Sequence, residues 1–538
     1  MTEITKAYEA APGTEILIDE NQSHNIHRFQ HAEHGDGHIL LVPQPSLTDL
    51  NDPLCWPQWK KWMVYINGLG YSFLGSIIGP IMSGGMVQQA AFFNIPISHL
   101  AWSAGICIIA SGVATAFMMP LSVKIGRRPI FLLSTLAMGL GCVWCGIASR
   151  TTFASFFVGR AFVGLLSGPV EALIPSTITD IFFLHDRGEK ISIYGLSVLG
   201  GNELGPILAF FILSFGIFVN FITIFFFMPE TVYYGSRPVI SLTSEAEVSS
   251  EKKGDESIDA DTKVTNADAA LDAKSEIGTT EVQIPQKSYL DSIKLWSKDA
   301  INPHVSYRKA FLRPFVLCTY PTVMWASLVY GMSLTWNVVL ALTIAQLFAP
   351  PPYSFDSGAQ GLIFLAPFVG SLIGTYLCGR LADQIALYYT RKNNGIREPE
   401  MRLPIALLAT ILNFVGVAIA GPCYHYKTHW IGPIIGFGVL SIGAQMGCNL
   451  SMTYALDCHK ELSGELMITV SVIKSLIAWA WSWFINDWIA LNGMMTVYFI
   501  IAGINVIVYG STLIFYLKGK EFRIGIQKRD LFGRTGLA

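Results

Sequence analysis

Long apolar runs of about twenty residues recur along this chain, and they constrain its fold more than any other feature. A helix needs roughly 20 mostly apolar residues to cross the ~30 Å hydrocarbon core of a bilayer. Clear runs of this kind occupy residues 63–82, 100–122, 130–148, 153–174, 315–344, 358–378, 403–422, 430–456, 464–485 and 494–517. Because only 14% of the 538 residues are charged, against roughly 25% in soluble domains, the composition excludes a soluble globule.

The segment 191–228 is apolar too, but hydropathy does not settle how often it crosses the membrane. Lys and Arg residues collect in the short cytoplasmic loops of membrane proteins. The 379–402 link carries five of them, whereas the 349–357 link carries none. A single crossing by 191–228 would place the five charges outside, so the charge pattern predicts two crossings and twelve spans.

Two crossings within 191–228 predict a cramped hairpin. The segment has 38 residues, and two helices with a turn need at least ~40. Gly216 is the expected turn, which leaves a sixth span of about a dozen residues, or ~18 Å of helix. The predicted fold is an all-α membrane protein of twelve transmembrane helices in two six-helix halves, with spans five and six abnormally short.

Two polar stretches divide the chain into regions. Residues 241–290 contain 11 Asp or Glu against 5 Lys, a composition typical of disorder. The predicted regions are a disordered cytoplasmic tail at 1–58, an N-terminal helix bundle at 59–234, an acidic cytoplasmic linker at 235–310, a C-terminal helix bundle at 311–518 and a cytoplasmic tail at 519–538.

No pattern indicates a metal, a cofactor or a nucleic acid. Cys142 and Cys145 lie in an apolar run without a second pair at ligand spacing, so they are interpreted as buried core residues. With a net charge of −2, the chain has no basic block that could follow phosphates. The absence of a His-Asp or Cys-His constellation likewise argues against an enzyme.

Two loops carry related motifs at equivalent places in the two halves. Residues 120–129 read PLSVKIGRRP, and residues 379–383 read GRLAD. These resemble the right-hand and left-hand ends of the loop signature G-x-L-x-D-R-x-G-R-R/K of the major facilitator superfamily, although Met119 and Val123 replace its first Gly and its Asp. The resemblance implies a gating role for Gly126, Arg127, Arg128, Gly379 and Asp383, and paired loops imply pseudo-symmetric halves.

Further strings narrow the resemblance. The run from Gly159 to Gly164 is similar to the superfamily's fourth-span motif with its buried Arg. The run from Gly201 to Pro206 is similar to the antiporter motif G-x-x-x-G-P-x-x-G-G of the fifth span, with its last two Gly replaced. Residues 51–61 and 398–403 resemble fungal members of the twelve-span drug:proton antiporter branch.

The resemblance implies a secondary transporter that exports a small organic compound, a drug or secondary metabolite, by alternating access coupled to protons. The implied partners are the substrate, protons and the lipid bilayer, and the chain is expected to act as a monomer in the cell membrane, with the vacuolar membrane as an alternative. Uptake of a nutrient or organic cation on the same fold stays open, as does a membrane enzyme or sensor.

Charges inside apolar runs point to the mechanism, because each costs about 2.5–3.5 kcal/mol at mid-helix. Arg160 and Glu171 are eleven residues apart, so they share a helix face roughly 16 Å apart and cannot pair directly. A poorly solvated carboxyl at such a place can take up a proton on one side and release it on the other. We therefore predict proton coupling by Arg160, Glu171 and Glu203. The alternatives are a hydrogen bond from Glu171 to a neighbouring helix and a helix-end role for Glu203.

Polar and aromatic residues in the spans are candidates for the substrate cavity: Asn67, Asn337, Gln445, Asn449, Lys474 and Trp479. The amides can instead hold helices together. Lys474 can reach the aqueous interface along its aliphatic stem, and Trp479 can belong to an interfacial aromatic belt. These alternatives stay open.

Overall fold

The computed structural model describes residues 13–16, 43, 45–46, 49–235, 288–292, 294, 306–393, 396–459, 462–529 and 535. Within these ranges the regular structure is helical except for one two-stranded sheet, in which β1 (Glu15–Ile16) pairs antiparallel with β2 (Ile396–Arg397). Most of the predicted tail at 1–58 and of the predicted linker at 235–310 lies outside the described residues.

The N-half runs from α2 to α9, with short helical turns at its ends. Its long helices are α2 (Gln58–Ile77), α4 (Ile97–Ile125), α5 (Arg127–Ala148), α6 (Phe153–Ser167) continued by α7 (Val170–Ile181), α8 (Leu184–Leu204) and α9 (Phe210–Phe227). Its short elements are η2 (Pro53–Cys55), η3 (Ser83–Gly85), α3 (Met86–Phe93) and η4 (Gly205–Ile207).

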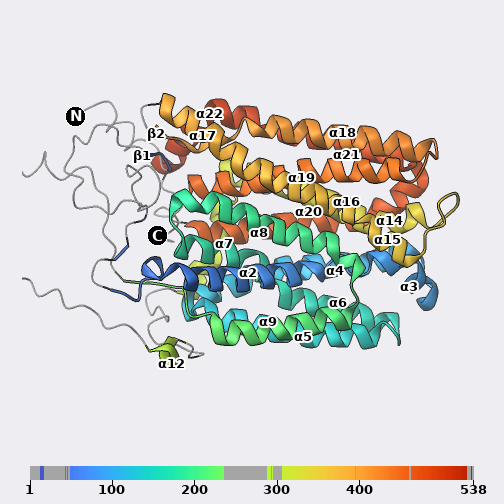
Figure 1. The fold of residues 1–538 in the computed structure, drawn as a ribbon, viewed down its shortest axis with the longest axis horizontal. Helices are drawn as coiled ribbons and strands as arrows, with labels where there is room; N and C mark the ends of the chain where they lie inside the picture. Colours follow the sequence, from blue (N-terminus) through green and yellow to red (C-terminus); the bar gives the residue numbers. More distant parts are fainter. Residues whose placement is uncertain are drawn as a thin grey trace, which may run out of the picture.

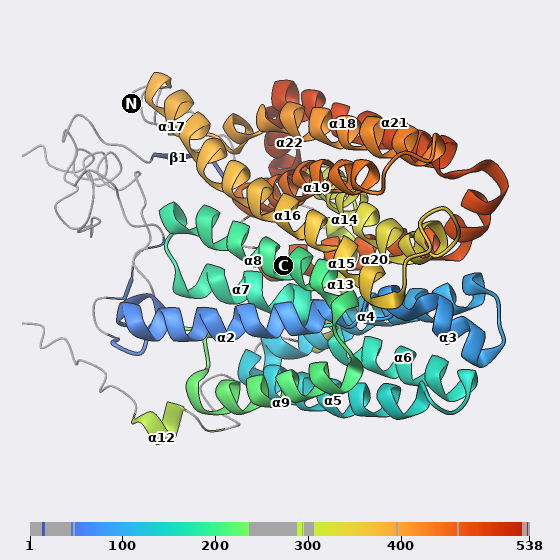
Figure 2. The same ribbon diagram turned by 45° about the vertical axis from the view of Figure 1, so that its right-hand side comes forward.

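The C-half runs from α14 to α22 and is preceded by α12 (Tyr289–Ser292) and α13 (Tyr307–Leu317). Its elements are α14 (Pro321–Phe348), α15 (Ser357–Ile363), α16 (Leu365–Tyr376), the π-helical η6 (Leu377–Leu381), α17 (Ala382–Lys392), η7 (Pro399–Arg402), α18 (Ile405–His425), α19 (Ile431–Cys458), α20 (Ser463–Asn492), α21 (Met494–Gly510) and α22 (Thr512–Arg529). Figure 2 shows the blue-to-green N-half and the yellow-to-red C-half as two groups of lengthwise helices.

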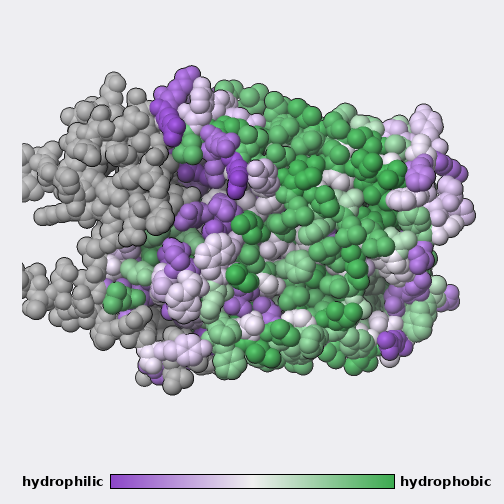
Figure 3. All heavy atoms as spheres, in the orientation of Figure 1, coloured by the Kyte–Doolittle hydropathy of each residue, from purple (hydrophilic) through white to green (hydrophobic). Residues whose placement is uncertain are grey.

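Ten helical segments among the described residues are long and apolar enough to cross a membrane. α2 and α8 also run lengthwise in the same bundle (Figure 1), so each half contains six long helical segments. Green, apolar residues form a band over the middle of the molecule, and purple residues gather at both ends (Figure 3). The predicted all-α membrane fold with two helical halves is confirmed.

The predicted turn at Gly216 and the predicted short hairpin are wrong. The chain turns at η4 instead, so that α8 has 21 residues and α9 has 18, or about 31 Å and 27 Å of helix. α8 begins at Leu184 and includes charged residues that a search for apolar runs passes over. Those charges lie at the end of the helix, where Arg187 donates to the Thr179 carbonyl oxygen and Lys190 lies 4.3 Å from the Trp62 ring centroid.

The central helices form the contact between the halves. In its most apolar stretch α14 is 89% buried, whereas α9 is only 28% buried and faces outward. α4 of the N-half packs along α20 of the C-half, and α8 packs along α16. Glycines allow the first contact, because a Cβ on Gly112 would lie 2.6 Å from the Ser475 Cβ. Side chains on α4, α7, α14 and α20 therefore meet at the centre of the bundle.

Candidate functional site

A cavity of about 100 Å³ lies between the two halves. The end of α2, with α4, α7 and α8, lines it from the N-half, and α14 and α20 line it from the C-half. Its wall is mostly apolar, with a few polar groups such as Glu171, Asn202, Asn337 and Lys474. An apolar cavity with few converging polar groups is the usual form of a small-molecule site.

An ion pair between the halves forms part of the cavity wall. The Lys474 Nζ on α20 donates to both carboxylate oxygens of Glu171 on α7, and the two side chains are 9% and 18% exposed. Glu171 lies in the first turn of α7, directly after the break at Gly168 and Pro169 that separates α6 from α7. The positive end of the helix dipole favours a carboxylate there. Tyr194 of α8 donates to the Glu171 carbonyl oxygen at 2.7 Å.

Two buried polar atoms at the cavity have no hydrogen-bond partner among the described residues. They are the Asn337 Nδ2 and the Ser76 Oγ, on side chains 7% and 9% exposed. Buried donors and acceptors are nearly always satisfied in folded proteins. A substrate or water in the cavity can supply the missing partners.

Arg160, predicted to take part in proton coupling, contacts the end of α2 in the structure. Its guanidinium donates to the carbonyl oxygens of Ile78 and Gly79, the latter at 2.7 Å, where α2 ends. A positive charge at the carboxyl end of a helix stabilises the helix dipole. Arg160 is fully buried and does not line the cavity, so it holds the end of α2 next to the cavity.

Glu203 lies in the last turn of α8 and faces the C-half. Its Oε1 accepts a hydrogen bond from Ser371 of α16 at 2.7 Å, and Ser441 of α19 lies close by. Its Oε2 has no hydrogen-bond partner among the described residues, and the side chain is 1% exposed. Burying an ionised carboxylate without a cation costs far more free energy than burying the neutral acid.

Of the six predicted cavity residues, Asn337 and Lys474 line the cavity and the other four lie elsewhere. Asn67 donates to the Met63 carbonyl oxygen on its own helix. Gln445 of α19 donates to the Thr375 hydroxyl of α16 at 2.8 Å, as expected for a residue that holds helices together, and Asn449 accepts from Gln445 on the same helix. The Trp479 ring lies 6.0 Å from the Trp483 ring in an aromatic group between α4 and α20.

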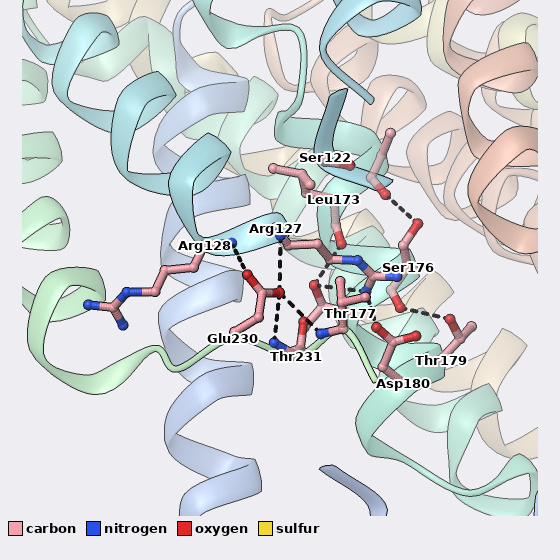
Figure 4. Close-up of polar contacts among 12 residues, drawn as sticks. Ser122, Arg127, Arg128, Leu173, Ser176, Thr177, Thr179, Asp180, Glu230 and Thr231 are labelled. Carbon is pink, nitrogen blue, oxygen red and sulfur yellow. Dashed lines mark hydrogen bonds and ion pairs between the residues drawn. The ribbon is translucent and has the colours of Figure 1, made fainter. Parts of the chain in front are cut away.

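The first predicted gating loop, between α4 and α5, contacts α7 and the end of α9 in the N-half (Figure 4). Gly126 has a φ of 96°, which favours glycine, and turns the chain from α4 into α5. The backbone N–H groups of Arg127 and Arg128 donate to the Glu230 carboxylate at 3.0 and 3.1 Å. The Arg127 side chain pairs with Asp180 at 2.5 Å, and the Arg128 side chain donates to the carbonyl oxygens at the end of α9.

The second predicted gating loop joins the two halves. Asp383 pairs with Arg402, and Arg402 also donates to Asp457 at 3.0 Å. Gly188 of α8 lies directly against this group, since a Cβ there would be 2.9 Å from the Arg402 Nη2 and 3.3 Å from the Asp383 Oδ1. A Cβ on Gly379 would lie 3.8 Å from the Ser192 Cβ. We call this end of the bundle, which carries β1 and β2, the strand end.

The halves also meet at the opposite end. Gly84 of η3 and Gly361 of α15 both face the Pro206 carbonyl oxygen, at 2.6 and 3.2 Å from the position of a Cβ. The cavity therefore lies between two contacts that join the halves, one at each end. Among the described residues, no group of three or more His, Cys, Asp or Glu side chains could hold a metal ion.

The apolar band and the two helical halves, with a cavity between them, define a multi-pass membrane protein. The sequence profile of the Major Facilitator Superfamily matches residues 63–482. The chain belongs to this superfamily.

Fungal transporters are among its relatives. An uncharacterised MFS-type transporter of Schizosaccharomyces pombe is 27% identical over 96% of this chain and 93% of its own length. The protein HOL1 of Saccharomyces cerevisiae is 24% identical over 95% of each chain. The MFS-type transporter penM of Penicillium rubens is 25% identical over 81% of this chain and 80% of its own length.

Solved structures share the fold. The human organic anion transporter MFSD10 matches with a TM-score of 0.54 and 15% identity, over 85% of this chain and 100% of its own. The proton:xylose symporter XylE matches with a TM-score of 0.53 and 12% identity, over 86% of this chain and 97% of its own.

Proposed function

We propose that this protein is a proton-coupled antiporter that exports a small organic compound by alternating access. One observation carries the proposal: the cavity wall contains an ion pair, Glu171–Lys474, whose partners belong to different halves. Alternating access moves one half against the other around a fixed site, so this pair must lengthen or break in each cycle.

A proton or a substrate lowers the cost of breaking the pair. Separating two buried charges is unfavourable unless each finds a new partner. Protonation of Glu171 removes one charge, and a polar substrate can bind the group that is released. Lys474 is then free to hold an acceptor group of the substrate, with Asn337 and Ser76 offering further hydrogen bonds. In this way proton uptake and substrate release share one site.

Glu203 is the second proton-binding group in the proposal. It lies at the contact between α8 and α16, and its carboxyl binds Ser371 across the halves. Loss or gain of a proton there changes the contact between the halves and not the cavity itself. Glu203 would therefore favour one conformation over the other, while Glu171 responds to the substrate.

The strand end faces the cytosol in this proposal, and the protein acts as a monomer in the cell membrane. Arg127, Arg128 and Arg402 gather at that end, as the positive-inside rule requires of short cytoplasmic loops. Fungal relatives such as penM are described as transporters, which supports a transport function, and export of a small organic compound is the direction that we propose. A proton:sugar symporter shares the fold, so uptake by symport is the second candidate.

The test uses purified protein in vesicles that contain a pH-sensitive dye. A panel of organic cations, anions and zwitterions is added one compound at a time, and the internal pH is recorded. Antiport predicts that an entering compound drives protons out, whereas symport predicts that protons enter with it. A chain that moves compounds without any proton flux would disprove the coupling.

Glu171→Gln is the variant that tests the site. We expect it to insert normally and to lose the proton flux that a transported compound induces. Glu398→Gln is the matched control, because Glu398 also pairs with a lysine, Lys520, but neither residue lines the cavity. Unchanged proton flux in Glu171→Gln would contradict the role of the ion pair.

A further inference from the structure

A short segment of the N-terminal tail lies on the C-half. β1 (Glu15–Ile16) pairs with β2 in the link between α17 and α18, with Glu15 opposite Arg397 and Ile16 opposite Ile396. Figure 1 labels the two strands together at the strand end. Residues 13–16 precede the whole N-half in sequence. Their contact with β2 therefore joins a segment before the N-half to the C-half, which follows the N-half in sequence.

Gly13 lies tightly against the end of α19. Its φ is 83°, and a Cβ there would lie 2.6 Å from the Asp457 carbonyl oxygen and 3.1 Å from the Cys458 Cα. Both the backbone conformation and the lack of space exclude a larger residue. The tail segment is therefore fitted to this surface and not merely near it.

Thr14 completes a buried charged group. Its side chain is 5% exposed, and its Oγ1 accepts a hydrogen bond from the Arg523 Nη1 at 3.2 Å. The Arg523 side chain is fully buried and also donates to both carboxylate oxygens of Glu400, at 2.9 and 2.7 Å. Thr14 thus accepts a hydrogen bond from a guanidinium nitrogen that does not donate to Glu400. This contact stabilises the folded state, because a buried charged donor without an acceptor is costly in free energy.

The surface that binds residues 13–16 continues into the contact between the halves. Gly13 lies on the backbone of Asp457, and the Asp457 carboxylate accepts from Arg402 at 3.0 Å. Arg402 pairs with Asp383, and Gly188 of the N-half lies against both. Asp457 and Arg402 thus connect the tail segment to the N-half.

We propose that residues 13–16 form a strap that holds the strand end of the transporter closed. The docked strap fixes β2, the end of α19 and Arg523, and these groups hold Arg402 and Asp383 in the position where Gly188 fits against them. A segment that stabilises one conformation shifts the population toward it. Release of the strap therefore favours opening at the strand end. The proposal needs only alternating access, so it stands or falls independently of proton coupling and of the substrate.

The test uses the full chain in lipid nanodiscs. Hydrogen exchange at residues 396–402 reports docking of the strap, and alkylation of the native Cys378 by a water-soluble maleimide reports opening. Cys378 is buried and lines a small cavity between the halves with Gly188, Asp383 and Arg402. Peptide mass spectrometry resolves each cysteine, so Cys142, buried in the N-half, serves as the internal control for unfolding.

Two variants remove the strap without removing the tail. Gly13→Ala adds one methyl group that the docked geometry has no room for, and Thr14→Val removes the hydroxyl. Loss of a hydrogen bond to a charged group corresponds to roughly tenfold or more in the docking equilibrium. We expect exchange at 396–402 and alkylation of Cys378 to accelerate about tenfold, while Cys142 stays unreactive. Gly35→Ala makes the same chemical change elsewhere in the tail and should alter neither readout.

Addition in trans provides the second arm. A chain without residues 1–16 should show fast alkylation of Cys378, and a peptide of residues 8–20 should slow it again. The same peptide with Gly13→Ala should have no effect. Faster exchange at 396–402 with unchanged alkylation of Cys378 would overturn the proposal, because the strap would then dock without controlling the opening. Unchanged exchange and alkylation in both variants would overturn it as well.

Discussion

The ion pair in the cavity gives a prediction whose magnitude can be worked out from its burial. Lys474→Met removes the ammonium and leaves the Glu171 carboxylate, 18% exposed, without its cation. Removing one partner of a buried pair costs about 3–5 kcal/mol. Because the pair is slightly open to the cavity, we expect the lower end, about 3 kcal/mol of unfolding free energy at pH 7.

The double variant distinguishes the pair from its separate residues. In Glu171→Gln with Lys474→Met no charge is left, so most of the loss should be recovered, to within about 1 kcal/mol of the wild type.

Denaturant titration of the purified protein in mixed micelles measures these free energies. Lys520→Met is the matched control, because Lys520 pairs with Glu398 and is 43% exposed. An exposed pair of that kind contributes less than about 1 kcal/mol. Additive effects of the two cavity substitutions, or a loss in Lys474→Met no larger than in Lys520→Met, would refute the reasoning.

Three further predictions concern stability. Glu230→Gln removes the charge that accepts from the first N–H groups of α5 and should cost about 1–2 kcal/mol, measured by the same titration. Gly416→Ala should cost about 1–3 kcal/mol, because its Cβ would lie 2.6 Å from the Leu440 Cα of α19. Gly503→Ala, with nothing within 4 Å, should be neutral or slightly stabilising. Burial and the charge of Arg523 lower the pKa of His459 from 6.5 to about 4. As the pH falls from 6.5 to about 4, the unfolded state takes up a proton that the folded state does not, so stability should decline by roughly 3 kcal/mol. His459→Gln should flatten this decline, and an unchanged pH profile would contradict it.

The hairpin between spans five and six marks a limit of reading spans from hydropathy. The predicted turn at Gly216 failed because α8 starts with charged residues that lie outside the apolar band. Helical structure continues beyond the bilayer wherever other contacts satisfy those charges, as Trp62 does for Lys190. The number of apolar residues reports only the part of a helix that lies within the bilayer, and not the full length of the helix. The predicted turn at Gly216 therefore lies too late in the chain.

For the candidate site too, the sequence identified some features and only the structure showed the others. The free-energy cost of a charged side chain within the membrane was enough to identify Glu171 and Lys474 as candidates, because a charge in an apolar run is unfavourable wherever its partner lies. Which groups pair was not accessible, since Glu171 and Lys474 are 303 residues apart in sequence. Arg160 shares a helical face with Glu171 only if the helix is straight, and the break at Gly168 and Pro169 interrupts it. Its guanidinium binds the end of α2 instead.

The sequence by itself determined the membrane class, the two halves and the loops that join the helices. These depend on apolar length, charge bias and local motifs, which are properties of neighbouring residues. Only the tertiary structure decided which helices face the cavity, that Gln445 joins α19 to Thr375 of α16 and that residues 13–16 lie on the C-half. The physical reason is that a polar group in an apolar bundle requires a hydrogen-bonding or charged partner. The sequence shows which polar groups require one, but the position of the partner depends on how distant helices pack.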